Sequence, residues 1–249
     1  ADRINQLPLG VLGAAAGTTL LPVLTRHLAA GEHDVAHAVQ NRSINYVLLL
    51  TLPAVAGLLV LADPIMIVLF GHGSFTEQDA ILSAQSLRAY ALGLPAFVLV
   101  KVLAPAFFAR GDTRTPVYVG VSVMVINLIF NLILMKPLAH VGPPLASSLA
   151  AMLNVGALAV LLSRNAALSV PASMMLRLGR VLLATIGMGV GLACVSYAVP
   201  MPDGLVWRGL WLGGMVWLGG LFYLAGLVAL RVLDPVQAFG ALRKRLSRR

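Results

Sequence analysis

A few polar side chains lie inside otherwise apolar stretches of the sequence, and these are the residues that could do chemistry. Arg3 opens the first stretch beside Asp2, Asn5 and Gln6, and Lys101 lies well inside the third. A guanidinium group matches two phosphate oxygens at once, and a lysine that faces lipid at that depth is costly. The pattern predicts a wet cavity that binds an anion at Arg3 and Lys101. The alternatives are that Arg3 reaches out to the lipid headgroups and that Lys101 makes a structural ion pair.

A second polar group lies further along the chain. Asn127 and Asn131 are four residues apart, so they share one face of a helix, and Ser147 lies near the start of the next apolar stretch. Such residues often form hydrogen bonds between membrane helices. A cation site is the functional alternative, although amide and hydroxyl groups without a carboxylate bind a hard cation weakly.

Several classes of function lack the residues they need. The five histidines all fall between the apolar stretches, and the sequence has neither HExxH nor GxSxG, so we expect no enzyme activity, no metal site and no cofactor. The single cysteine, Cys194, fits a small packing residue. The net charge of +9 comes from residues that flank apolar stretches, without interleaved aromatic residues, so we expect no nucleic-acid partner.

The elements that must position these side chains are membrane helices. Hydrophobic residues make up 59% of the chain and charged residues 11%, and the mean hydropathy is +0.90. The apolar runs are continuous, which excludes a barrel, and each is close to the roughly 20 residues that cross a bilayer. The sequence predicts an all-α, polytopic helical membrane protein with about seven transmembrane helices, at residues 4–24, 44–61, 89–108, 117–135, 145–162, 181–199 and 205–230.

The connections and the small residues give further expectations. Residues 27–41 are polar and should include a short interfacial helix, and residues 64–70 are too short to span and should lie at the interface. Residues 71–76 should form a turn, and Thr76 followed by Glu77 and Asp79 suits a helix start. Small residues allow close packing of membrane helices, which we expect at residues 13–17 and at Gly187, Gly189, Gly191, Gly209 and Gly213.

The basic residues predict how these helices are inserted. Counting back from the tail, 13 of the 18 Lys and Arg residues fall on its side of the membrane and four on the other, with Lys101 inside a span. Positive charge is enriched on the cytoplasmic side, so we expect a cytoplasmic C-terminus. The first residue is Ala1 and the first span follows almost at once, so we expect the chain to be the C-terminal part of a longer membrane protein.

Four stretches of the sequence resemble motifs of the MurJ (MviN) family. They are residues 1–13 with Leu20-Leu21-Pro22 following, residues 69–76, residues 100–110 and residues 112–117, and their order and spacing agree over about 165 residues. Members of the family are lipid II flippases of the MOP superfamily, with two lobes and fourteen spans. The resemblance implies the C-terminal half of such a transporter: residues 1–165 in the second lobe, 166–231 as two additional helices that could form a lipid-tail groove, and 232–249 as a basic tail.

The same resemblance implies a function and the residues that serve it. The chain would move lipid II, an undecaprenyl-pyrophosphate-linked precursor of peptidoglycan, across the bacterial inner membrane by alternating access, with membrane lipids and the N-terminal lobe as partners. Arg3 matches the arginine thought to bind the pyrophosphate, and Asp2 matches its acidic neighbour. Asn127, Asn131 and Ser147 fall where some relatives bind sodium, but the acid expected near Asn131 is absent.

Other functions remain open at this point. Transport could be driven by membrane potential, protons or sodium. A polysaccharide-lipid flippase or a multidrug exporter of the same superfamily would share the fold, although a drug exporter should prefer an acidic cavity. The alternative from another class is a non-transporting membrane scaffold for cell-wall synthesis.

Overall fold

The structure is a computed structural model that describes residues 2–71, 76–165, 168 and 171–233. Most of the expected turn at residues 71–76 and most of the expected basic tail at residues 232–249 lie outside the described residues. The described elements are all helical: α1 (Asp2–Ala29), α2 (His33–Phe70), α3 (Glu77–Phe108), α4 (Arg114–Leu138), the 3-10 helix η1 (Ala139–Val141), α5 (Gly142–Arg164), α6 (Ala172–Ala198) and α7 (Leu205–Ala229).

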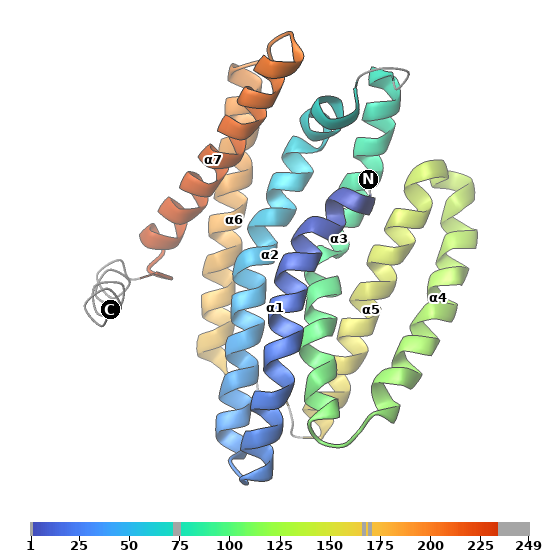
Figure 1. Cartoon of the computed structure of the whole chain (residues 1–249), viewed down its shortest axis with the longest axis vertical. Coiled ribbons are helices and arrows are strands. Elements are labelled where there is room, and N and C mark those ends of the chain that lie inside the picture. The colour runs from blue at the N-terminus through green and yellow to red at the C-terminus, as the bar shows by residue number, and fades with distance from the viewer. Residues whose placement is uncertain (1, 72–75, 166–167, 169–170, 234–249) are drawn as a thin grey trace.

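The prediction of an all-α membrane fold is confirmed. Five stretches of the described chain are long and apolar enough to cross a membrane: α2, α3, one stretch that contains both α4 and α5, α6 and α7. Since Figure 1 shows α4 and α5 as an antiparallel pair, this stretch corresponds to two of the predicted spans. The assignment of α1 as a further span stays a prediction.

The start of α3 follows directly from its sequence. Thr76 is the N-cap, and its hydroxyl accepts a hydrogen bond from the backbone N–H of Asp79 at 3.2 Å. The Asp79 carboxylate accepts one in return from the backbone N–H of Thr76 at 3.0 Å. This reciprocal arrangement satisfies two donors that a helix end leaves free. The helix start expected at Thr76 is confirmed.

Helix α2 is longer than the sequence pattern predicts. The polar residues up to Asn41, expected as a connection with a short interfacial helix, belong to α2 from His33 onward. At its other end, α2 continues through Pro64 to Phe70, although Pro64 was expected to begin a separate interfacial segment. A proline removes one helical hydrogen bond, and neighbouring groups in a bundle can compensate for the loss.

The helices form two groups that meet at α2. In the first, α3 lies at the centre and packs against α1, α2 and α5. In the second, α6 and α7 pack against each other and against α2, on the side of the bundle away from α4 (Figure 1). Helix α4 lies at the far edge and packs mainly on α5. This arrangement places α2 between the first group and the last two helices.

Close approach between helices depends on a few glycines. A Cβ on Gly93 of α3 would lie 2.5 Å from Ser148 Oγ and 2.7 Å from Ser148 Cα on α5. A Cβ on Gly226 of α7 would lie 3.1 Å from Ala184 Cβ on α6, so these two helices are also in close contact. The packing role expected for Gly191 of α6 is confirmed, because a Cβ there would lie 2.9 Å from the Phe222 ring of α7. A Cβ on Gly187, Gly209 or Gly213 meets no atom of the described chain within 4 Å, so the packing expected there is not found in it.

Candidate functional site

The first turn of α1 is polar, and its side chains point in different directions. The carboxylate of Asp2 accepts a 2.6 Å hydrogen bond from the Gln6 side chain, and both residues are exposed. Asn5 is only 3% exposed, and its Oδ1 has no hydrogen-bond partner among the described residues. Arg3 is exposed and makes no hydrogen bond or ion pair with the part of the chain that is described. Its guanidinium group is therefore available to a ligand.

Lys101 lies on α3 and is likewise exposed, although its neighbours Val102 and Leu103 are buried. Neither a carboxylate nor a carbonyl of the described residues accepts a hydrogen bond from it. The structural ion pair considered for Lys101 therefore has no acceptor in the described part of this chain.

Arg3 and Lys101 lie at different depths. Asp2 interacts electrostatically with Tyr90 of α3, which places the start of α1 beside that part of α3. Lys101 follows Tyr90 by eleven residues. At a rise of about 1.5 Å per residue, that distance is about 16 Å along the helix. The two cations are therefore separate positions along the bundle and do not hold one small anion together.

The second polar group, Asn127, Asn131 and Ser147, forms part of its hydrogen bonding internally, between Asn131 and Asn127. The Asn131 amide donates to the Asn127 backbone carbonyl and to Asn127 Oδ1, both at 2.9 Å, and both residues are half-buried on α4. Ser147 is half-buried on α5, and its neighbour Ser148 donates a 2.7 Å hydrogen bond to the Ala89 carbonyl on α3. No cluster of three His, Cys, Asp or Glu residues that could hold a metal ion occurs among the described residues. Among the described residues, the hydrogen bonds of Asn127 and Asn131 thus lie within α4 and not between helices, and the cation site stays a prediction.

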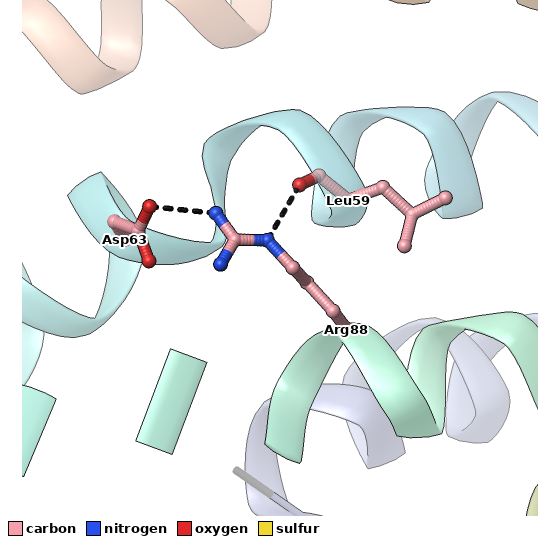
Figure 2. A network of polar contacts seen from close by, with 3 residues as sticks. All are labelled: Leu59, Asp63 and Arg88. Carbon is pink, nitrogen blue, oxygen red and sulfur yellow. Dashed lines mark hydrogen bonds and ion pairs between the residues drawn. The ribbon is translucent and has the colours of Figure 1, made fainter. Parts of the chain in front are cut away.

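The ion pair between Arg88 and Asp63 was not predicted from the sequence. Figure 2 shows Arg88 of α3 reaching α2, where its Nη2 donates to Asp63 Oδ2 at 2.6 Å and its Nε donates to the Leu59 carbonyl at 3.1 Å. Pro64 cannot donate to the carbonyl of Val60, so the helical ladder is incomplete at this turn. Arg88 thus links α3 to α2 next to the weakened turn. The sequence signal was a pair of opposite charges at facing ends of consecutive spans.

An apolar groove lies between α2, α6 and α7. Its volume is about 490 Å³, and along α2 it runs from Leu49 to Ile65. The sixteen residue-to-residue steps of helix from Leu49 to Ile65 extend about 24 Å, most of the roughly 30 Å of a hydrocarbon core. Among the described residues that line it, Tyr223 has the one polar side chain, and its hydroxyl donates a 2.6 Å hydrogen bond to the Leu49 carbonyl. The groove therefore offers a surface for a long hydrocarbon chain.

Comparison with known proteins decides the family of this chain. The sequence profile of the family described as lipid II flippase MurJ matches residues 1–204. The chain belongs to the MurJ family. A probable lipid II flippase MurJ of Rhizobium meliloti (strain 1021) is 48% identical over 155 residues, which cover 62% of this chain and 29% of that protein. The corresponding protein of Rickettsia prowazekii (strain Madrid E) is 37% identical over 197 residues, which cover 79% of this chain and 39% of that protein.

A solved structure supports the MurJ fold. The lipid II flippase MurJ in an inward closed conformation aligns with 92% of this chain and 46% of its own, with a TM-score of 0.75 and 23% identity. The chain therefore spans less than half the length of these MurJ relatives. Its family and its apolar helices together make it a multi-pass protein of the bacterial inner membrane.

Proposed function

We propose that this chain forms the C-terminal half of a lipid II flippase, which moves the precursor from the cytoplasmic to the outer leaflet by alternating access. The observation that carries the proposal is the family match over residues 1–204, because the relatives that share this sequence are named lipid II flippases. The N-terminal lobe would supply the other wall of the transport cavity. The C-terminus would lie in the cytoplasm, as the distribution of positive charge predicts.

Arg3 is the residue that we propose for binding the pyrophosphate, with Asp2 beside it. A bare diphosphate cannot cross hydrocarbon, because an isolated buried charge carries a large desolvation cost. A guanidinium group in a wet cavity removes much of that cost through paired, charge-assisted hydrogen bonds. The exposure of Arg3 and its lack of a partner among the described residues agree with this role.

Lys101 would contact the pyrophosphate at another depth along the transport cavity. Because it lies about 16 Å further along α3, it would contact the diphosphate before or after Arg3 does. The lipid chain would stay in the apolar groove between α2, α6 and α7 while the headgroup moves. The cycle would draw on the membrane potential, on protons or on sodium, and transport measured with each gradient abolished in turn distinguishes them.

The test is substitution of Arg3 in the full-length flippase. We expect Arg3→Ala to abolish support of growth in cells depleted of their own flippase, with normal membrane insertion, and Arg164→Ala at the end of α5 to have no effect. Depleted cells should accumulate lipid II in the inner leaflet, whereas loss of a scaffold would not cause this. Normal complementation by Arg3→Ala would refute the role of Arg3.

A further inference from the structure

A basic cavity lies between α2 and the start of α6, toward the end of the bundle predicted to be cytoplasmic. Its volume is about 460 Å³, and Arg42 of α2 and Arg177 of α6 both line it. Asn45, Tyr46 and Ser173 contribute further polar groups. None of the described residues that line this cavity is acidic. Two cations without a neighbouring carboxylate create a positive potential that an anion would neutralise.

A second cavity of about 340 Å³ adjoins the first. It shares Ser173 and Arg177 with the first cavity and adds Arg180 and Arg231, again with no acidic residue in its described lining. The two cavities together are therefore lined by four arginines, which come from α2, from α6 and from the turn that follows α7. One phosphate group, or two linked ones, would find several guanidinium groups within one small region.

Two local features of this region favour binding of an anion: the orientation of Arg42 and the start of α6. The Arg42 guanidinium lies 5.5 Å from the centre of the Tyr46 ring and donates to the Tyr46 hydroxyl at 3.1 Å, which fixes its orientation at the edge of the cavity. Helix α6 begins beside the cavity, after Pro171, and no side chain caps its first turn. The N-terminal end of a helix carries partial positive charge and free N–H groups, which add to the attraction of the arginines.

The basic cavity joins the apolar groove. Leu49 lines both, so a ligand in the cavity has a hydrophobic surface next to it that extends along α2 to Ile65. Positive charge at one end and a long apolar surface at the other complement an anionic lipid. Such a ligand would keep its phosphate at the interface and its chain within the hydrocarbon.

We propose that this cavity is a second phosphate site, distinct from Arg3, which binds the phosphate headgroup of a lipid whose chain lies in the apolar groove. Arg42 and Arg177 bind the phosphate oxygens. The site lies toward the opposite end of α1 from Arg3, since α2 starts where α1 ends. A phospholipid of the bilayer and a polyprenyl diphosphate share the required chemistry, and the experiment separates these two sources.

The experiment measures lipid binding to the full-length protein in detergent by native mass spectrometry. The probes are phosphatidylglycerol, undecaprenyl diphosphate, phosphatidylcholine and inorganic diphosphate. We expect Arg177→Gln and Arg42→Gln each to weaken binding of the anionic probes about tenfold, as loss of a charged hydrogen bond implies. Arg164→Gln, which removes a charge that lines neither cavity, should leave binding unchanged. If phosphatidylglycerol binds more tightly than undecaprenyl diphosphate, the ligand is a phospholipid of the bilayer, and if undecaprenyl diphosphate binds more tightly, it is a polyprenyl diphosphate.

A second pair of variants tests the groove. Gly220 lines the groove and Gly213 does not, and a Cβ on either meets no atom within 4 Å. Gly220→Leu should therefore weaken binding of both anionic lipids but not of inorganic diphosphate, while Gly213→Leu changes neither. Because Arg177 has no partner among the described residues, its substitution tests the site even if Arg42→Gln unfolds.

Two results would overturn the proposal: anionic lipids binding equally to wild-type protein and to Arg177→Gln, or phosphatidylcholine binding as tightly as phosphatidylglycerol and undecaprenyl diphosphate. Arg3→Ala should bind the anionic lipids as the wild-type protein does. Loss of growth support in Arg3→Ala therefore tests the proposed transport function, and loss of lipid binding in Arg177→Gln tests the basic cavity.

Discussion

Gly93 provides a sharp test of how α3 and α5 pack. In Gly93→Ala the new Cβ would lie 2.7 Å from Ser148 Cα, and backbone cannot move aside as a flexible side chain can. Carbon atoms prefer about 3.5 Å or more, so the helices must separate by about 0.8 Å. Overpacking of this kind costs about 1–3 kcal/mol. The same movement weakens the hydrogen bond from Ser148 to the Ala89 carbonyl, worth about 0.6 kcal/mol in a membrane bundle. We expect a total loss of about 2–3 kcal/mol in the free energy of unfolding.

The assay is unfolding of the full-length protein from mixed micelles by sodium dodecyl sulfate, followed by circular dichroism. Gly120→Ala on α4 is the matched control, because its Cβ meets no atom within 4 Å, and it should be neutral or stabilising by up to about 1 kcal/mol. Ser148→Ala alone should cost about 0.6 kcal/mol. The double variant should lose less than the sum of the single losses, because both substitutions disturb one hydrogen bond. If Gly93→Ala unfolds at the wild-type detergent fraction, the close approach of α3 and α5 is wrong.

Three further perturbations test other parts of the chain. Arg88→Met leaves Asp63 without its partner and should cost no more than about 1 kcal/mol of unfolding free energy, since both side chains are more than a third exposed and solvent screens their attraction. An unchanged unfolding midpoint would contradict a stabilising ion pair. Asp112→Ala removes the carboxylate that accepts a hydrogen bond from the Thr115 backbone N–H at 3.0 Å and should cost about 1 kcal/mol. Hydrogen bonds from Thr115 lower the pKa of Asp112. The stability that ionised Asp112 contributes is therefore present above the unfolded pKa of about 3.9 and is lost as pH falls through the lower folded pKa. Asp112→Asn should remove this dependence of stability on pH, and unfolding at pH 3 and at pH 6 would measure it. Residues 1–249 reconstituted alone should not flip lipid II, and a fluorescent lipid II assay showing transport would refute the need for a second lobe.

The sequence predicted what depends on local chemistry. Continuous apolar runs predicted helices, and Thr76 with Asp79 predicted where α3 begins. The extent of α2 was not predictable in this way, because hydropathy marks where a helix crosses lipid and not where its hydrogen-bonded ladder ends. Polar residues before Asn41 continue the same helix as the apolar ones after it.

Contacts between helices depend on their rotation and offset, which a single sequence does not encode locally. Gly187, Gly191 and Gly209 all resembled packing glycines, yet of these three only Gly191 lies against a neighbouring helix in the described chain. Gly226, which the sequence did not single out, also lies against one. The rotation and offset of helices also explain why the geometry of the candidate site was not predictable from the sequence. Arg3 and Lys101 could both be recognised as cations at or within apolar stretches, but their separation along the bundle depends on how far α3 is offset from α1.

Helix α4 has a consequence for how the protein is made. None of its residues is buried, and it packs mainly on α5. Its entry into the bilayer must therefore rest on its own affinity for hydrocarbon, with little help from previously inserted helices. A lysine at Met124, near its middle, would carry an insertion cost of about 2.5–3.5 kcal/mol, whereas leucine there would disturb no contact of the folded chain. Selection during biosynthesis, more than selection for a packed interior, should govern which residues α4 accepts.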